Sequence, residues 1–250
     1  MIRIIKAETE QEVGKLAADI VTGVLERNPC ATIGLATGSS PAEMYRDLIR
    51  RYEAGEISFR GVSTVNLDEY VGLSPDHDQS YAYFMRDNLF DHVDIDKSNT
   101  NIPFGLAKDI AAECKRYDAV IDSMGGVDLQ VLGIGNNGHI GFNEPADHFT
   151  YGTNCVDLTQ STIDANSRFF SSRDLVPTKA ITMGVGQIMK AEKILLIVNG
   201  KRKAEILERA LFGEVTPTVP ASILRFARDV VVCADAEALS VIAAKHPEAL

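Results

Sequence analysis

Short apolar strands alternate with helices along the whole chain, and this alternation is the strongest constraint on its fold. Strands are predicted at residues 2–6, 31–36, 62–67, 127–134, 193–198 and 229–233. Helices are predicted over residues 9–27, 41–52, 80–90, 108–123 and 201–212, with a last, C-terminal helix after residue 233. Because strands that alternate with helices favour a parallel sheet, we predict an α/β fold. It should be a Rossmann-like, single-domain three-layer sandwich over residues 1–250, with helices on both faces of a mostly parallel sheet.

Two helix starts carry capping signals. Thr9 and Glu12 have the spacing of a capping box, in which a hydroxyl and a carboxylate bond free N–H groups at the helix start. Ser40, Pro41 and Glu43 repeat this pattern, with Ser40 as the predicted N-cap. Residues 150–178 are rich in Ser, Thr, Asn and Asp, and their sequence predicts no definite helix.

Composition and charge argue against several classes of partner. The 250 residues carry a formal net charge of −10, which disfavours nucleic acid, since phosphate backbones need a basic field. No apolar stretch approaches the roughly 20 residues of a membrane span, and charges interrupt the N-terminal apolar run, so neither a membrane span nor a signal peptide is expected. No CxxC pair occurs among Cys30, Cys114, Cys155 and Cys233, which indicates no zinc site and a reduced, cytoplasmic setting.

Chemically reactive or ligand-binding residue types follow four of the predicted strands. They lie in the loop after Ala36, at Asp68, in the loop after Ile134, and at Gly200. The carboxyl ends of parallel strands meet at one edge of a sheet, and ligands of open α/β sheets bind beyond that edge. We therefore expect these four positions to converge on one pocket.

The loop after the second predicted strand reads Thr37-Gly38-Ser39-Ser40 and leads into a helix. A helix N-terminus offers free N–H groups and a positive dipole to an anion, and glycine lets the backbone approach it closely. The loop lacks the Gly-Lys-Ser/Thr ending of a nucleotide-binding P-loop. It is therefore either a phosphate site or an ordinary strand-to-helix turn. Lys201–Lys203 offers cations for a phosphate, or is a solvated cluster.

Asp68 and Glu69 are adjacent carboxylates at the end of a predicted strand. A carboxylate fixed there is a candidate general base. Neighbouring side chains diverge in an extended chain, so Glu69 should point away from a pocket that Asp68 faces. The alternative is a helix-capping or solvated acidic pair.

Residues 133–138 read GIGNNG and satisfy the dinucleotide pattern GxGxxG, which alone would indicate a nucleotide-dependent oxidoreductase. That pattern should open a long helix, whereas Pro145 arrives early enough to prevent one. His139 and Glu144 lie in between. An imidazole takes and returns a proton near neutral pH, and a nearby carboxylate can orient it. These residues favour a catalytic loop without a nucleotide cofactor.

Five motifs in this order resemble glucosamine-6-phosphate deaminases, the isomerising deaminases of amino-sugar catabolism. They are GLATGSSP at 34–41, NLDEYVGL at 66–73, QSYAYF at 79–84, GIGNNGHIGFNEP at 133–145 and ANSRFF at 165–170, and the similarity spans nearly the whole chain. The resemblance implies a fold shared with 6-phosphogluconolactonases and ribose-5-phosphate isomerases. It also implies conversion of glucosamine 6-phosphate and water into fructose 6-phosphate and ammonia, with no metal and no organic cofactor.

Residue roles follow from the same resemblance. Asp68 resembles the base that moves a proton from C2 to C1, and His139 the residue that assists opening of the pyranose ring. Glu144 and Asn137 resemble the pair that orients and polarises that imidazole. The implied phosphate site comprises Thr37, Gly38, Ser39, Ser40, Arg168 and Lys203. Tyr81 would line the sugar site, and residues 150–178 would form a mobile lid that shields the intermediate from water.

Two departures from the resembling sequences carry information. Some of these enzymes have Asp where this chain has Asn137, and an amide accepts no proton, so Asn137 should only orient His139 by hydrogen bonds. Glu144 is then the only carboxylate that this loop supplies to the imidazole. Allosteric members bind N-acetylglucosamine 6-phosphate through basic residues where this chain has Asn154 and Val156. We therefore predict no activation by that effector.

Two alternatives on the same fold are a 6-phosphogluconolactonase, which hydrolyses a lactone, and a non-catalytic sugar-phosphate sensor. The lactonase needs no base for a C2 proton, so Asp68 and Glu144 favour the deaminase. A sensor should have lost Asp68 or His139, and both are present. The expected partner is a small phosphosugar. The sequence leaves open whether the protein is a monomer or a homo-oligomer.

Overall fold

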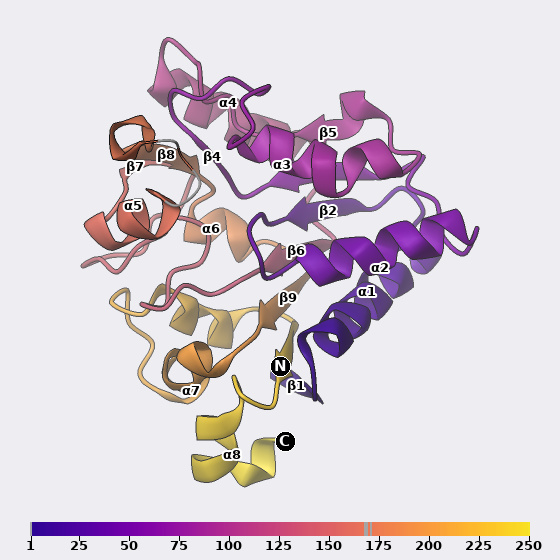
Figure 1. Ribbon diagram of the computed structural model, residues 1–250, viewed down its shortest axis with the longest axis vertical. Coiled ribbons are helices and arrows are strands. Elements are labelled where there is room, and N and C mark those ends of the chain that lie inside the picture. The colour runs from indigo at the N-terminus through magenta and orange to yellow at the C-terminus, as the bar shows by residue number, and fades with distance from the viewer. Residues whose placement is uncertain (1, 168–169, 171) are drawn as a thin grey trace.

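A parallel sheet of seven strands forms the centre of the molecule (Figure 1). The computed structural model describes residues 2–167, 170 and 172–250. In spatial order the strands are β1 (Ile2–Ala7), β10 (Val230–Asp235), β9 (Lys193–Val198), β6 (Leu129–Leu132), β2 (Thr32–Leu35), β3 (Ser63–Asn66) and β5 (Thr100–Asn101). The pairings between all these neighbours are parallel. The predicted parallel sheet is confirmed.

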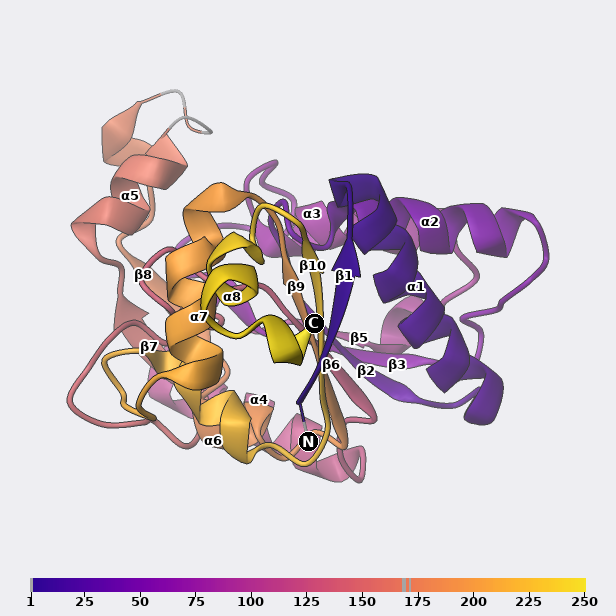
Figure 2. The same ribbon diagram turned by 90° about the horizontal axis from the view of Figure 1, so that it is seen from below.

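Helices cover both faces of this sheet. The longer ones are α1 (Glu10–Arg27), α2 (Ala42–Glu53), α3 (Tyr81–Asn88), α4 (Ile110–Ser123) and α7 (Ala204–Phe212), and the shorter ones are α5 (Gln160–Asn166), α6 (Val185–Ile188) and α8 (Ser240–Lys245). Figure 2 shows α1 and α2 on one side of the sheet and α7 and α8 on the other. The three-layer α/β sandwich is therefore confirmed. Within the described ranges, no helix combines the length and the apolar character that crossing a bilayer requires.

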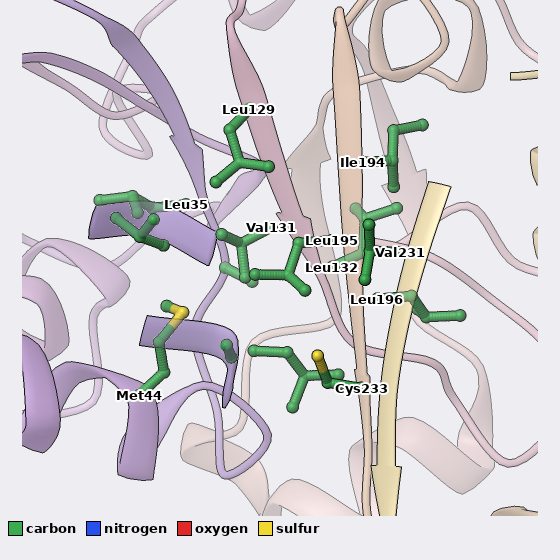
Figure 3. Packing of buried hydrophobic residues seen from close by; sticks show 14 of the residues in the cluster. Leu35, Met44, Leu129, Val131, Leu132, Ile194, Leu195, Leu196, Val231 and Cys233 are labelled. Carbon is green, nitrogen blue, oxygen red and sulfur yellow. The ribbon is translucent and has the colours of Figure 1, made fainter. Parts of the chain in front are cut away.

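The central strands are buried on both faces because they carry apolar side chains at consecutive positions. All six residues of β10 are buried, as are five of the six in β9. Figure 3 shows Val131, Leu195 and Val231 side by side on the paired strands β6, β9 and β10. Full burial of each large aliphatic side chain contributes about 1.5–3 kcal/mol to stability. This core holds the strand ends in fixed positions.

A second, smaller sheet was not predicted. It is antiparallel and consists of β4 (Asp68–Tyr70), β8 (Lys179–Thr182) and β7 (Asn154–Asp157). The strand predicted at residues 62–67 is β3, which stops at Asn66; Asp68 follows it as expected, but it also opens β4, which was not predicted. A small cluster of buried residues supports this sheet, namely Tyr70, Leu73, Phe142, Leu158 and Ala180.

One of the two predicted helix caps is confirmed. Thr9 Oγ1 accepts the N–H of Glu12 at 3.2 Å, whereas α2 has Pro41 at its N-cap position and no capping side chain. The prediction of Ser40 as N-cap was wrong. A Cβ built on Gly133 would lie 3.1 Å from Ser40 Oγ, so this hydroxyl lies against the loop after β6. A contact with a distant part of the chain has thus replaced a local one.

The order of strands changes direction between β2 and β6. The chain adds β3 on one side of β2, whereas β9 lies on the far side of β6. The loops that leave β2 and β6 therefore diverge, and in open α/β sheets a ligand crevice forms at such a point.

Candidate active site

One cleft of about 450 Å³ opens at this point. Its described lining comes from the loops after β2 and β6, from Leu67 and Asp68, from the starts of α3 and α7, and from Thr162 of α5. The predicted site residues in this lining are Thr37, Gly38, Ser39, Ser40, Asp68, Tyr81, Asn137, His139 and Lys203. Glu144 reaches the cleft through its contact with His139. Arg168 lies outside the described residues. Three of the four expected positions therefore converge on this cleft, whereas Gly200 is not among its lining residues and Lys203 represents that region instead.

Asp68 forms a buried acidic group in the wall of the cleft, with 6% of its surface exposed. Burial, reinforced by the charge of Glu69, raises the pKa of Asp68 to about 8. Gly141 lies beside it: a Cβ there would be 3.5 Å from Asp68 Oδ2, an ordinary van der Waals contact. Near neutral pH this carboxyl therefore exchanges a proton readily, as a general base must.

Glu69 points elsewhere, as predicted. Its carboxylate accepts the backbone N–H groups of Tyr70, Tyr81 and Ala82 at 2.8–2.9 Å, so it holds the start of α3. Carboxylates are favourable at helix N-termini, where N–H groups have no partner within the helix. Glu69 therefore has a structural role, and the two neighbouring acids serve different purposes.

His139 lies in a tight loop without a helix after β6, as expected from Pro145. Gly135 donates its N–H to the carbonyl of His139 at 2.8 Å. The imidazole lies over Gly135, where a Cβ would come within 2.4 Å of its Cε1 and Nε2 atoms. The Nδ1 atom is 3.1 Å from Glu144 Oε1, within ion-pairing distance but not aligned as a hydrogen bond. The ring position thus depends on a glycine beneath it and a carboxylate beside it.

Glu144 is held through both of its oxygens. Oε2 accepts from Asn137 Nδ2 at 2.5 Å, and Oε1 accepts from Thr162 Oγ1 at 3.0 Å. Burial alone would raise the pKa of Glu144, but its contacts with His139, Asn137 and Thr162 outweigh this and lower it. The carboxylate form is therefore favoured.

Asn137 forms the predicted hydrogen bond to His139, but to its main chain. Its amide group donates to Glu144, and its Oδ1 accepts the backbone N–H of His139 at 3.2 Å. Asn137 therefore positions the carboxylate and the main chain, and no hydrogen bond from it to the imidazole ring is found among the described residues. Thr162 was missed altogether, because it lies in the segment 150–178, where no pattern indicated its position.

The loop at residues 37–40 and Lys203 belong to the same cleft lining. Gly38 has φ of +86°, in the left-handed region that favours glycine. The N-terminus of α2 follows without a capping side chain, so its free N–H groups suit an anion. Lys203 Nζ donates to the carbonyl of Ile134 at 2.7 Å, and burial, together with the charge of Arg202, lowers the pKa of Lys203. This arrangement is chemically suited to a phosphate group.

Tyr81 is the first residue of α3 and forms part of the cleft wall. Its ring stacks on Phe142 with centroids 6.1 Å apart, and its hydroxyl is 3.3 Å from that of Tyr70. Burial and the nearby Tyr70 and Asp68 raise the pKa of Tyr81 well above its ordinary value. Tyr81 therefore offers a neutral hydroxyl and an apolar ring face.

The fold and the cleft define a class. A 6-phosphogluconolactonase from Thermotoga maritima matches the structure with a TM-score of 0.74 over 94% of this chain and 100% of that chain, and at 18% identity this shows a shared fold alone. The sequence profile of the family "Glucosamine-6-phosphate isomerases/6-phosphogluconolactonase" matches residues 5–233. The chain belongs to this family.

Relatives of known name are more specific. A glucosamine-6-phosphate deaminase of Clostridium perfringens (strain SM101) is 52% identical over 241 residues, which cover 96% of this chain and all of that one. The enzyme of the same name from Clostridium botulinum (strain Langeland) is 48% identical and covers 98% of this chain and all of its own. The solved structure of a monomeric glucosamine-6-phosphate deaminase of the NagB superfamily is 45% identical, with a TM-score of 0.93 over 96% of this chain and 99% of that chain. The resemblance found in the motifs is confirmed.

Proposed function

We propose that this protein converts glucosamine 6-phosphate and water into fructose 6-phosphate and ammonia, as a cytoplasmic enzyme of amino-sugar catabolism. One observation carries the proposal. A buried acid with a raised pKa, Asp68, shares a cleft with the His139–Glu144 pair and with the anion-binding loop at residues 37–40. The named relatives support the same reaction.

His139 opens the pyranose ring. Ring opening moves a proton from the O1 hydroxyl to the ring oxygen O5, and an imidazole performs both halves of that transfer. Glu144 lies 3.1 Å from Nδ1 and stabilises the charge that the ring carries between the two halves. Asn137 holds Glu144 in that place.

Asp68 then isomerises the open chain. Its carboxylate removes the proton from C2 to give an enolamine and returns a proton to C1, which leaves an imine at C2. Water adds to the imine, and ammonia leaves as the C2 ketone forms. A carboxyl with a pKa of about 8 is a stronger base than an exposed aspartate, which suits removal of a carbon-bound proton.

The phosphate anchors the substrate. We assign it to Thr37, Gly38, Ser39 and Ser40 with the free N–H groups of α2, and to Lys203 and Arg168 as cations. Binding energy gained at the phosphate positions C1 and C2 between the two catalytic groups. Tyr81 lines the sugar.

We further propose that residues 1–250 form one catalytic domain and that residues 150–178 act as its mobile lid. Thr162 of α5 lines the cleft, Ile163 packs on the small cluster, and Leu158 belongs to that cluster. The segment thus places a side chain at the site, as a lid that shields the intermediate requires, while its β7 part is held by pairing with β8.

The decisive measurement is ammonia release from glucosamine 6-phosphate, with Asp68→Asn beside the wild type. We expect rapid release by the wild type and a loss of at least about 1000-fold in Asp68→Asn, since an amide is no base. Asp76→Asn, at an exposed carboxylate, should retain full activity. Rapid hydrolysis of 6-phosphogluconolactone without ammonia release would contradict the proposal in favour of the lactonase, and substrate binding without turnover would favour the sensor. Full activity of Asp68→Asn would refute the role of that residue.

A further inference from the structure

A line of polar contacts runs from the start of α5 to the imidazole of His139. Thr159 Oγ1 lies 2.9 Å from Thr162 Oγ1, and Thr162 Oγ1 lies 3.0 Å from Glu144 Oε1. The same Glu144 oxygen is 3.1 Å from His139 Nδ1. Three contacts therefore connect a helix of the segment 150–178 with the ring that the proposed mechanism uses.

The chemistry of these groups fixes the direction of the line. An ionised carboxylate only accepts, so Thr162 must donate its single hydroxyl hydrogen to Glu144. The contact between the two hydroxyl groups then requires Thr159 to donate to Thr162. Thr159 Oγ1 also accepts the backbone N–H of Thr162 at 3.3 Å, as the N-cap of α5. Each donor points toward Glu144, and hydrogen bonds aligned in this way polarise one another.

Thr162 is also the only residue of α5 among the described lining of the cleft. Nearby residues of the chain serve another purpose, since Leu158 belongs to the small cluster of the second sheet and Ile163 packs against it. The position of α5 on that cluster therefore determines whether the hydroxyl of Thr162 can donate to Glu144 Oε1.

We propose that Thr162 is a positioning residue that acts on His139 through Glu144, so that ring opening depends on the seating of α5; this inference rests on the proposed function. With α5 seated, the hydroxyl of Thr162 and the amide of Asn137 clamp one oxygen each of Glu144. The clamped carboxylate then faces Nδ1 of His139. With α5 unseated, Glu144 loses one donor and gains freedom to rotate.

The effect of Thr162 on the titration of Glu144 can be separated from the effects of other titratable groups at the cleft. The described titratable groups that line the cleft are Asp68, Tyr81, His139 and Lys203. Of these, His139 alone bears on the pKa of Glu144, which its contacts lower in spite of burial. Thr162→Val removes the hydroxyl, keeps the side-chain shape and keeps the backbone N–H that Thr159 caps. A change in the titration of Glu144 in this variant therefore reports the lost donor.

The first test requires no turnover. The carboxyl carbon of Glu144 is followed by 13C NMR against pH in the wild type, Thr162→Val and Thr162→Ser, with Glu144→Gln to assign the signal. We expect the midpoint to rise by about half a pH unit or more in Thr162→Val, because a donor to the charged form is lost. Thr162→Ser keeps the hydroxyl and should titrate as the wild type does. Equal midpoints in the wild type and Thr162→Val would overturn the proposal.

The second test links the contact to catalysis. In ammonia release, Thr162→Val should lower kcat about tenfold with KM within about twofold, while the acid limb of the kcat profile stays in place because Asp68, with a pKa of about 8, sets it. Thr162→Ser should restore kcat. An unchanged kcat in Thr162→Val would overturn the coupling to ring opening. Absence of ammonia release by the wild type would instead refute the proposed function, while the NMR titration would still show whether Thr162 holds Glu144.

Discussion

Asp68 shows how the proposed chemistry opposes stability at a single residue. Its pKa is about 8 in the folded chain, against an ordinary value of 3.8, chiefly because the side chain is buried. Between these values the folded protein keeps a proton that the unfolded chain has released. The free energy of unfolding therefore falls as the pH rises from about 4 to about 8. Asp68, which the proposed reaction needs as a base, thus lowers the free energy of unfolding near neutral pH, where the enzyme would work.

This argument predicts that Asp68→Asn is more stable than the wild type. The gain should be small near pH 4 and should grow through pH 8, where it reaches the order of several kcal/mol, because asparagine carries no charge into the buried site. Urea unfolding at pH 5, 7 and 8.5 measures it. Asp147→Asn is the control, since Asp147 is exposed and paired with His148, which lowers its pKa. A stability difference that stays constant from pH 4 to pH 8 would contradict the prediction.

Gly135 carries a second prediction at this scale. A Cβ at this position would lie 2.4 Å from the ring of His139, so Gly135→Ala must displace the imidazole from Glu144. Ammonia release should fall at least about 100-fold, because misplacing a catalytic group by about 1 Å costs that much. Gly23→Ala is the matched control, since a Cβ there meets only the end of Arg27 at 3.5 Å. Full activity of Gly135→Ala with an intact fold would show that the ring position does not matter.

At the scale of elements, the second sheet depends on one side chain of α4. Asp118 accepts the N–H of Thr153 at 3.0 Å and its hydroxyl at 2.6 Å, just before β7 begins. Asp118→Ala should therefore cost about 1–3 kcal/mol, since it leaves polar groups without partners. Urea unfolding gives the total, and hydrogen exchange at the amides of β7 should show faster opening there. Asp157→Ala, which removes an exposed pair with Lys179, should change neither. Equal exchange in the wild type and Asp118→Ala would refute the anchoring role.

The second sheet could not be predicted from the sequence, whereas the parallel sheet could. The parallel strands were predictable because each is a run of apolar residues followed by a helix. β4 and β8 are short and pair across more than a hundred residues, as Asp68 does with Thr182, and neither alternates clearly between apolar and polar positions. The position of Thr162 depends on that pairing and was therefore missed. Asp68, His139 and Glu144 were found because their chemistry and motifs are local.

At the scale of the whole molecule, strand order places the site. The loops after β2 and β6 diverge where the sheet changes direction, and they bring residues 37–40 and His139 to one cleft. Asp68 reaches the same cleft from the start of β4, which follows β3 directly in the chain. The chain carries a net charge of −10, so a phosphate must be bound by local features, such as the uncapped start of α2 and Lys203.

The last prediction concerns regulation of the whole molecule. Members of the family that are activated by N-acetylglucosamine 6-phosphate would need cations where this chain has Asn154 and Val156. Both residues serve the second sheet instead: Asn154 Nδ2 donates to the carbonyl of Gly152 at 3.2 Å, and Val156 packs on the small cluster. We therefore expect hyperbolic rate curves for glucosamine 6-phosphate, with the same kcat and KM in the presence of the effector. Initial rates over a range of substrate concentrations measure both. A sigmoidal curve that the effector makes hyperbolic would show that another part of the surface binds this anion, and that β7 gives no guide to regulation.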